Sequence, residues 1–488
     1  MSIRQEMTNG IVWTAIAKYS GIIISLIISA ILARLLSPDE FGIIAIATVS
    51  VNFLSIFSDI GLGTAVIQSN ELKETDYNEL FSLTIYIGLF ISFLAFISSY
   101  FIASFYQNEE LITICKILSI NLLFVTLNIL PNSLMVKNKR FKTIAKRTLF
   151  FQVLGGIIGV SLALLKFGAL ALVIPSTFAS IGIFLFNFKQ YPRKINFSLK
   201  LNSMKKIFSF SSYQFLFSFI NYFSRNLDKM IIGKYLNMGL LGYYEKSYRL
   251  MMLPLENVTF VINPVLLPVL SSLQNNKTEL AQKHEKLVSL ISNVSFPIGI
   301  LLHFTAYEVI NLYYGNNWNA AVPVFSILSL SIPLQMILST IGSIYQSAGN
   351  TKVMFFGGIS NSFFTLSGFF VAAFFYRTIE AIAWSWVITI SINFCISYIL
   401  LYQSTLKTSI HIFIKKLKKP FINSFICFIV LEVYSTYFNI TSNLWISFSS
   451  KMFLWLIITL ALGHFTKQYN VFIVAQTLLN NIKNKIKL

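Results

Sequence analysis

Residues 12–33 read VWTAIAKYSGIIISLIISAILA, an almost unbroken apolar run close to the start of the chain. A helix needs about 20 apolar residues to cross the hydrocarbon core of a bilayer. The run is too long for the apolar part of a typical signal peptide, and it lacks a clear cleavage motif of small residues. We therefore interpret it as an uncleaved first membrane span.

The composition of the whole chain supports this interpretation. Of the 488 residues, 55% are hydrophobic and 11% are charged, whereas soluble domains carry about 25% charged residues. The net charge of +20 would suggest a nucleic-acid partner in a soluble protein. Here the cations lie between long apolar runs, so we expect membrane lipid as the surroundings and no nucleic acid as a partner.

Further apolar runs follow along the chain, and together they predict about 14 membrane-spanning helices. The predicted spans are 12–33, 41–66, 80–106, 111–136, 148–165, 168–188, 208–233, 241–271, 287–312, 322–347, 353–376, 379–403, 420–439 and 444–466. The tail after residue 466 is expected to form either a short amphipathic helix on the membrane surface or a disordered end.

The distribution of Lys and Arg predicts the orientation of these spans. If the N-terminus lies in the cytoplasm, 27 of the 38 Lys and Arg residues fall on the cytoplasmic side and 5 on the outer side. Cytoplasmic loops of membrane proteins carry such an excess of Lys and Arg. We expect a multi-pass protein of a bacterial inner membrane with both termini in the cytoplasm.

Two segments 200 residues apart resemble each other. Residues 31–42 read ILARLLSPDEFG and residues 231–242 read IIGKYLNMGLLG, so that Gly42 aligns with Gly242. We expect an all-α membrane protein with two six-helix lobes, 1–190 and 191–406, related by a pseudo-two-fold axis along the membrane normal. Two additional helices and the tail would make up residues 407–488.

The predicted span 208–233 carries a stripe of polar residues. They recur at intervals of three and four, which places them on one helix face: Ser211, Gln214, Ser218, Asn221, Arg225 and Asp228. A charged side chain at the bilayer centre costs about 2.5–3.5 kcal/mol on insertion scales, so such residues normally face a bundle interior or a wet cavity.

Comparable polar stripes lie on three other predicted spans, and we expect them to line a polar cavity between the lobes. The residues predicted to line this cavity are Lys18, Asn52, Asp59, Asn221, Arg225, Asp228, Arg249 and Glu256. Two alternatives remain open for these residues. Small polar residues also hold membrane helices together, and Glu245 has the spacing for a local ion pair with Arg249. Asp228 would serve either cargo or proton binding, or hold Arg225 or Lys229.

Motifs for chemistry are missing from the sequence. It contains no phosphate-binding G-x-x-x-x-G-K-[ST] motif, no metal-ligand spacing among its four histidines, and no recognisable catalytic triad. The acidic pair Asp39 and Glu40 resembles that of membrane glycosyltransferases, but its loop is too short for a donor site. Pro38 and Asp39 are instead interpreted as the break after the first span and the cap of the second. Glu308 and Lys451 are expected near the membrane interface, with the long lysine chain reaching toward water. We expect neither an enzyme nor a metal site.

Three segments resemble a known family: ARLLSPDEFG at 33–42, DIGLGTAVIQ at 59–68, and SRNLDKMIIGKYL at 224–236 followed by LGYY at 241–244. They are similar to the WzxC-like branch of the Wzx-type polysaccharide-unit flippases. These flippases belong to the multidrug/oligosaccharidyl-lipid/polysaccharide exporter superfamily. The resemblance extends over the whole chain in the number of spans and in the repeat.

The resemblance implies a flippase for lipid-linked oligosaccharide units, carried on undecaprenyl diphosphate, in the synthesis of lipopolysaccharide or another surface polysaccharide. It implies alternating access through a cationic central cavity, no cofactor, and coupling to protons or sodium ions in some members. Arg225 and Asp228 match the R-N-x-D segment of the family. Superfamily analogy implies a monomer, with the polysaccharide polymerase machinery as a partner.

Other functions remain as alternatives at this point. A cation-coupled drug exporter or a lipid II flippase would have the same architecture, although a drug exporter would be expected to carry acidic rather than cationic cavity residues. A membrane polysaccharide polymerase or ligase would need a large outer loop with catalytic residues, and all loops here are short. A structural scaffold would make the cavity charges dispensable.

Overall fold

The protein is helical throughout the part that the computed structural model describes. That part comprises residues 3–58, 62–69, 72–195, 211–274, 276–438 and 443–466, without the side chains of 3–9, 11, 64, 65, 68, 211–221, 260–265, 267–269 and 351. The expected tail helix after residue 466 lies outside the described residues. The all-helical content agrees with the class predicted from the sequence.

The chain divides into two compact units, Met1–Glu245 and Lys246–Leu488, with the boundary inside one long helix. The predicted lobe boundaries after residues 190 and 406 stay predictions. The first unit contains α1 (Ile3–Leu35), α2 (Pro38–Ser55), α3 (Leu62–Gln68), α4 (Glu74–Tyr106), α5 (Glu110–Leu127), α6 (Ile129–Lys137), α7 (Phe141–Leu164), α8 (Leu170–Gln190), α10 (Ser211–Tyr235) and the start of α11 (Met238–Ser271).

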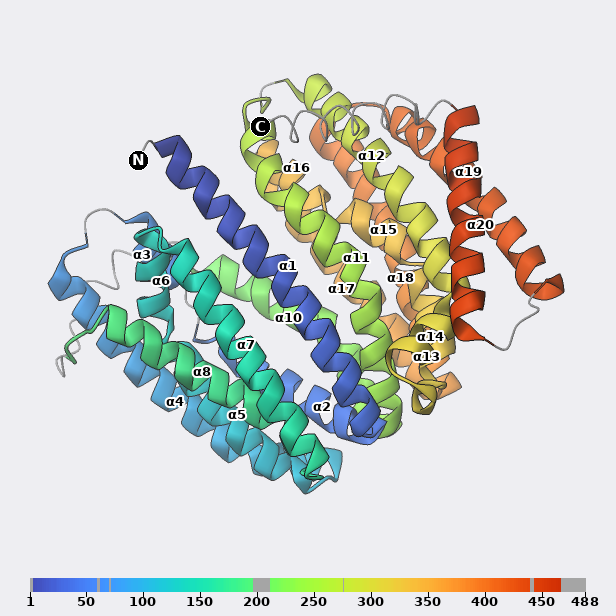
Figure 1. Ribbon diagram of the computed structural model, residues 1–488. Helices are drawn as coiled ribbons and strands as arrows, with labels where there is room; N and C mark the ends of the chain where they lie inside the picture. The colour runs from blue at the N-terminus through green and yellow to red at the C-terminus, as the bar shows by residue number, and fades with distance from the viewer. Residues whose placement is uncertain are drawn as a thin grey trace, which may run out of the picture. The chain divides into compact units, whose positions relative to one another are not determined.

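The second unit contains the rest of α11 and the C-terminal helices (Figure 1). These are α12 (Lys277–Phe304), α13 (Ala306–Tyr313), the 3₁₀ turn η2 (Asn316–Trp318), α14 (Ala321–Ser329), α15 (Ile332–Leu338), α16 (Ile341–Ser347), α17 (Thr351–Val371), the π-helical η3 (Ala372–Tyr376), α18 (Ile379–Leu400), the π-helical η4 (Leu401–Leu406), α19 (Ile410–Tyr437) and α20 (Leu444–Phe465).

Ten helices in the described residues are long and apolar enough to cross a membrane, or eleven if the bent stretch from Ala321 to Ser347 counts as one span. Three predicted spans are not among these ten helices. They are 41–66, which corresponds to α2 with α3, 208–233, which corresponds to α10, and 241–271, which corresponds to α11. In α10 and α11, part of the side chains lies outside the described residues, and only described residues count toward these spans.

The first unit is held together by close helix contacts at small residues. Helices α4 and α5 pack along each other, α8 packs on α5 and α7, and α1 lies along α7 (Figure 1). A side chain at Gly156 of α7 would meet the Ile28 side chain of α1 at 2.2 Å, and one at Gly159 would meet the Ala171 carbonyl of α8 at 3.1 Å. Glycine on α7 therefore permits both helices to approach closely, as small residues do in membrane bundles.

In the second unit, α19 packs along α12 and α20 packs on α19 (Figure 1). The ring of Phe428 on α19 lies 5.7 Å from His303 and 4.9 Å from Phe304, measured between ring centroids. On α20, the indole nitrogen of Trp455 donates to the carbonyl of Pro297 at 2.8 Å. The two additional helices are thus firmly packed against the second unit.

Several spans that the sequence predicts as single helices are broken. The span 111–136 breaks at Asn128, between α5 and α6, and Pro131 follows within the next turn. The span 322–347 bends by 47° between α14 and α15, and Pro333 follows this break. Proline removes a backbone donor and commonly kinks a helix. The predicted span 41–66 is likewise divided, because α2 ends at Ser55.

The internal repeat is confirmed at the two helical hairpins that carry it. Helix α1 ends at Leu35 and α2 begins at Pro38; α10 ends at Tyr235 and α11 begins at Met238. The same offset of 200 residues relates two glycines at the crossing of α2 and α11. A Cβ atom on Gly42 would lie 1.8 Å from the Met238 carbonyl oxygen, and one on Gly242 would lie 1.9 Å from the Pro38 carbonyl oxygen. The two contacts are equivalent within the repeat.

Candidate functional site

Asp228 is the most buried of those predicted cavity residues whose side chains the structure describes. Its side chain on α10 is 0% exposed. The hydroxyl of Tyr244 on α11 donates to one carboxylate oxygen at 2.9 Å, and the backbone N–H of Lys229 donates to the other at 2.8 Å. These two donors fix the carboxylate in one orientation, as expected for a buried charged group.

A second polar contact lies beside the first on the same hairpin. The Lys229 ammonium is 2.7 Å from the Glu245 carboxylate, so residues 228 and 229 of α10 face residues 244 and 245 of α11. The sequence suggested Glu245 as the local partner of Arg249, and the structure gives that carboxylate to Lys229 instead. The reason is the hairpin turn, which places the end of α10 against the start of α11. In this turn the Leu240 N–H donates to the Asn237 side-chain oxygen at 2.7 Å.

Arg225 lies one turn before Asp228 on α10 and is exposed. The described residues contain no hydrogen-bond or ion-pair partner for its guanidinium. Asp228 therefore does not hold Arg225. Close by, the Tyr222 hydroxyl donates to the Val49 carbonyl of α2, and the Phe53 ring lies 5.3 Å from that of Phe223. Helix α2 is therefore packed against the part of α10 that precedes Arg225.

Two of the other predicted residues of the first unit have clear positions. Asn52 is exposed on α2, and Lys18 is half-buried on α1. One turn beyond Lys18, the Gln152 side chain of α7 donates to the Gly21 carbonyl at 2.7 Å, so part of the polar stripe of α1 faces α7. Asp59 lies outside the described residues, as does the side chain of Asn221.

The exposed face of α1 is apolar, which differs from the open polar face that the stripe suggested. Tyr19, Ile23 and Ile27 are 49%, 59% and 55% exposed. Their spacing of four places them on one side of the helix. Gly21 of α1 lies against α7, and the large apolar side chains lie on the exposed side of the helix.

The predicted residues of the second unit, Arg249 and Glu256, are both exposed and lie seven residues apart on α11. This spacing of two turns places them on the same side of the helix. Like Arg225, Arg249 has no hydrogen-bond or ion-pair partner in the part of the chain that is described. The described residues contain no group of three His, Cys, Asp or Glu side chains that could hold a metal ion.

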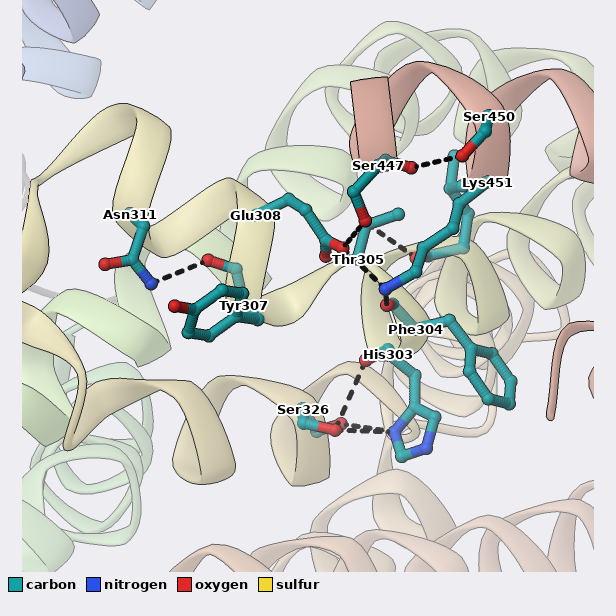
Figure 2. A network of polar contacts seen from close by, with 11 residues as sticks. His303, Phe304, Thr305, Tyr307, Glu308, Asn311, Ser326, Ser447, Ser450 and Lys451 are labelled. Carbon is teal, nitrogen blue, oxygen red and sulfur yellow. Dashed lines mark hydrogen bonds and ion pairs between the residues drawn. The ribbon is translucent and has the colours of Figure 1, made fainter. Parts of the chain in front are cut away.

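The structure adds a charged network that sequence reasoning placed elsewhere. Figure 2 shows the Lys451 ammonium of α20 pointing at the Glu308 carboxylate of α13 and at the Phe304 carbonyl, at 2.5 and 3.0 Å. The Ser447 hydroxyl donates to the same carboxylate oxygen at 2.5 Å. Glu308 is 1% and Lys451 5% exposed, so the lysine side chain does not reach toward water as expected. A charged side chain in an apolar span needs a partner. Glu308 and Lys451, which are 143 residues apart in the sequence, form such a pair.

Comparisons with known proteins agree with this architecture. A family model described as "Polysaccharide biosynthesis protein" matches residues 31–323. The teichuronic acid biosynthesis protein TuaB of Bacillus subtilis is 26% identical over 86% of this chain and 87% of its own length. The lipopolysaccharide biosynthesis protein WzxC of Escherichia coli is 24% identical over 86% of both chains. The succinoglycan biosynthesis transport protein ExoT of Rhizobium meliloti is 25% identical over 78% of this chain and 77% of its own.

Solved structures show the same fold. The lipid II flippase MurJ in an inward closed conformation superposes with a TM-score of 0.75 at 18% identity, covering 94% of this chain and 99% of the other. An inward-facing multidrug resistance transporter of the MATE family reaches a TM-score of 0.59 at 14% identity, covering 82% of this chain and 99% of the other. The all-helical membrane fold predicted from the spans and the repeat is therefore confirmed.

Proposed function

Since the chain belongs to the polysaccharide biosynthesis protein family, whose superfamily consists of multi-pass membrane transporters rather than enzymes, we propose that it flips a lipid-linked oligosaccharide across the inner membrane. The cargo would be a repeat unit of a surface polysaccharide on a polyprenyl diphosphate carrier. The relatives named for teichuronic acid, lipopolysaccharide and succinoglycan support this choice of cargo class. A polymerase or ligase does not fit a family of transporters.

The observation that carries the proposal is the exposed guanidinium of Arg225. It lies on α10, the helix whose sequence carries a polar stripe, and none of the described residues pairs with it. An unpaired cation within a membrane protein normally lines a wet passage. One turn away, the fixed Asp228 carboxylate leaves Arg225 available and holds α10 against α11.

The chemistry of the cargo suits such a cation. A diphosphate headgroup is anionic, and a guanidinium can donate two parallel hydrogen bonds to phosphate oxygens. Lys18 and Asn52, which lie in the same unit as Arg225, would add a cation and an amide to the passage, and Arg249 is an exposed cation of the second unit. The carrier chain would stay in the bilayer, where exposed apolar residues such as Ile23 and Ile27 on α1 provide a compatible surface.

The same charges disfavour a drug exporter for cationic compounds, because an unpaired guanidinium repels a cationic cargo. The remaining aspects of the proposal rest on the distribution of Lys and Arg and on the family resemblance. The excess of Lys and Arg in alternate loops supports a topology with both termini in the cytoplasm. The protein would act as a monomer, with protons or sodium ions as candidate coupling ions.

The proposal predicts the effect of removing the Arg225 charge. A strain that carries Arg225→Ala as its only copy should lose most of its surface polysaccharide, while Arg225→Lys should retain part of it because the positive charge remains. Surface polysaccharide is measured by immunoblot or by staining of extracts. The matched control is Lys194→Ala, which removes an exposed cation in the segment that follows α8.

Membrane abundance of each variant is measured in parallel, so that poor insertion is separated from poor transport. Normal polysaccharide in the Arg225→Ala strain would remove this residue from the mechanism. An equal loss in the Lys194→Ala strain would show that net charge rather than the position of Arg225 is responsible.

A further inference from the structure

Arg147 is a buried cation in the first unit that the sequence places among ordinary basic loop residues. It lies in the second turn of α7, and its side chain is 7% exposed. One terminal nitrogen donates to the Asn187 side-chain oxygen of α8 and lies 3.8 Å from the Met135 sulfur. The other donates to the Asn132 side-chain oxygen of α6 at 3.4 Å, and Nε has no partner.

The charge of this guanidinium is not neutralised by the protein. Among the described residues, no carboxylate lies within ion-pair distance of Arg147, and its partners are neutral amides and a thioether. A buried charge without an opposite charge is strongly destabilising. The hydrogen bonds satisfy two of the nitrogens and leave the net positive charge in place.

Three asparagines surround this guanidinium at the break between α5 and α6. Asn128 lies at the break itself, Asn132 lies in the first turn of α6, and the Asn187 amide nitrogen donates to the Asn128 side-chain oxygen at 2.7 Å. Amides are neutral, so they provide hydrogen bonds without an opposite charge. Arg147 therefore keeps an uncompensated positive charge, an arrangement that an anion would stabilise.

We propose that Arg147 and the three asparagines around it form a binding site for a phosphate-bearing anion. The planar guanidinium can bind two phosphate oxygens at once, and each asparagine can turn its amide to present N–H groups instead of oxygen. Exposed Arg140 at the start of α7 would attract the anion. Phosphate belongs either to a lipid headgroup or to a soluble ion, and the inference does not rest on the proposed transport function.

The test uses the purified full-length protein in nanodiscs of phosphatidylcholine. Thermal unfolding is measured with increasing inorganic phosphate or pyrophosphate, and separately with increasing phosphatidylglycerol in the nanodisc. A ligand that binds only the folded protein raises the unfolding temperature as its concentration exceeds its Kd. The wild type should show a saturable increase with at least one of these probes.

Variants identify the residue that is responsible. Arg147→Gln removes the charge and should raise the apparent Kd at least tenfold. Lys146→Gln removes an exposed cation one residue away and should leave the Kd within about twofold. If the Arg147→Gln protein does not fold, Arg147→Lys keeps the charge without the planar fork and should bind several-fold more weakly than the wild type.

The outcomes separate the sources of phosphate. A response to phosphatidylglycerol alone supports a lipid headgroup, and a response to the soluble ions supports a free anion. No response to any probe, or an equal response in wild type and Arg147→Gln, would overturn the proposal and leave Arg147 as a brace between α6, α7 and α8. An unchanged Kd in Arg147→Lys would equally contradict it.

Discussion

Alanine at position 42 should force α2 and α11 apart at their crossing. The new methyl carbon would start 1.8 Å from the Met238 carbonyl oxygen, and contacts of Cβ atoms shorter than 3.0 Å are essentially never observed, so one backbone must move by at least 1.2 Å. Overpacking of this kind typically costs 1–3 kcal/mol, and a contact with backbone belongs at the upper end. The better helix propensity of alanine returns about 0.8–1 kcal/mol. We expect a net loss of about 2 kcal/mol in the free energy of unfolding.

Gly242→Ala should cost about the same, because its methyl carbon would start 1.9 Å from the Pro38 carbonyl oxygen. The double variant is the sharper test. Once either alanine has moved α2 and α11 apart, the second methyl group causes no further clash. The double variant should therefore lose about as much unfolding free energy as one single variant. The coupling energy would then be about 2 kcal/mol, within the range for residues that share a contact.

Unfolding in mixed detergent micelles provides the measurement. The matched control is Gly342→Ala on α16, where a Cβ atom would meet no heavy atom within 4 Å. This control should be neutral or gain up to about 1 kcal/mol from helix propensity. If the variants at 42 and 242 behave like the control, or if their costs simply add in the double variant, the proposed shared crossing is refuted.

Two further predictions concern buried charges. Lys451→Met should cost about 3–5 kcal/mol of unfolding free energy, because Glu308 would remain buried without its partner. Adding Glu308→Gln should recover most of that loss. A double variant as unstable as the single one in the same detergent assay would contradict the ion pair. Tyr244→Phe should lower the free energy of unfolding by about 1–3 kcal/mol, because the buried Asp228 carboxylate loses a hydrogen-bond donor. Tyr307→Phe, the control at an exposed tyrosine, should leave it unchanged. Equal effects of the two variants would exclude the bond to Asp228.

Membrane spans could be predicted from the sequence because lipid imposes a simple requirement on composition. The helices nevertheless extend beyond the apolar runs: α12 begins at Lys277 and α19 at Ile410, whereas the predicted spans begin at 287 and 420. Charged turns continue a helix outside the lipid, and hydropathy does not detect them. The breaks in two spans were missed although Pro131 and Pro333 were visible, because membrane helices often tolerate proline.

The hairpin repeat was predicted because it depends on local sequence, with the same turn at residues 36–37 and 236–237. Side-chain partners were not predictable to the same degree. Lys451 meets Glu308 and Arg147 meets Asn187 only after distant helices pack together. A lone charge in an apolar span indicates that a partner exists, and the choice of partner is made by the tertiary structure.

The most direct test of the account is the side of the membrane on which the lipid-linked repeat units accumulate when the protein is absent. In inverted membrane vesicles from a deletion strain, a membrane-impermeant enzyme that cleaves the sugar headgroup should reach nearly all of the accumulated units, because they remain in the cytoplasmic leaflet. Re-expression of the wild type, but not of Arg225→Ala, should make most units inaccessible. Units that are already protected in the deletion strain would contradict the proposed transport step.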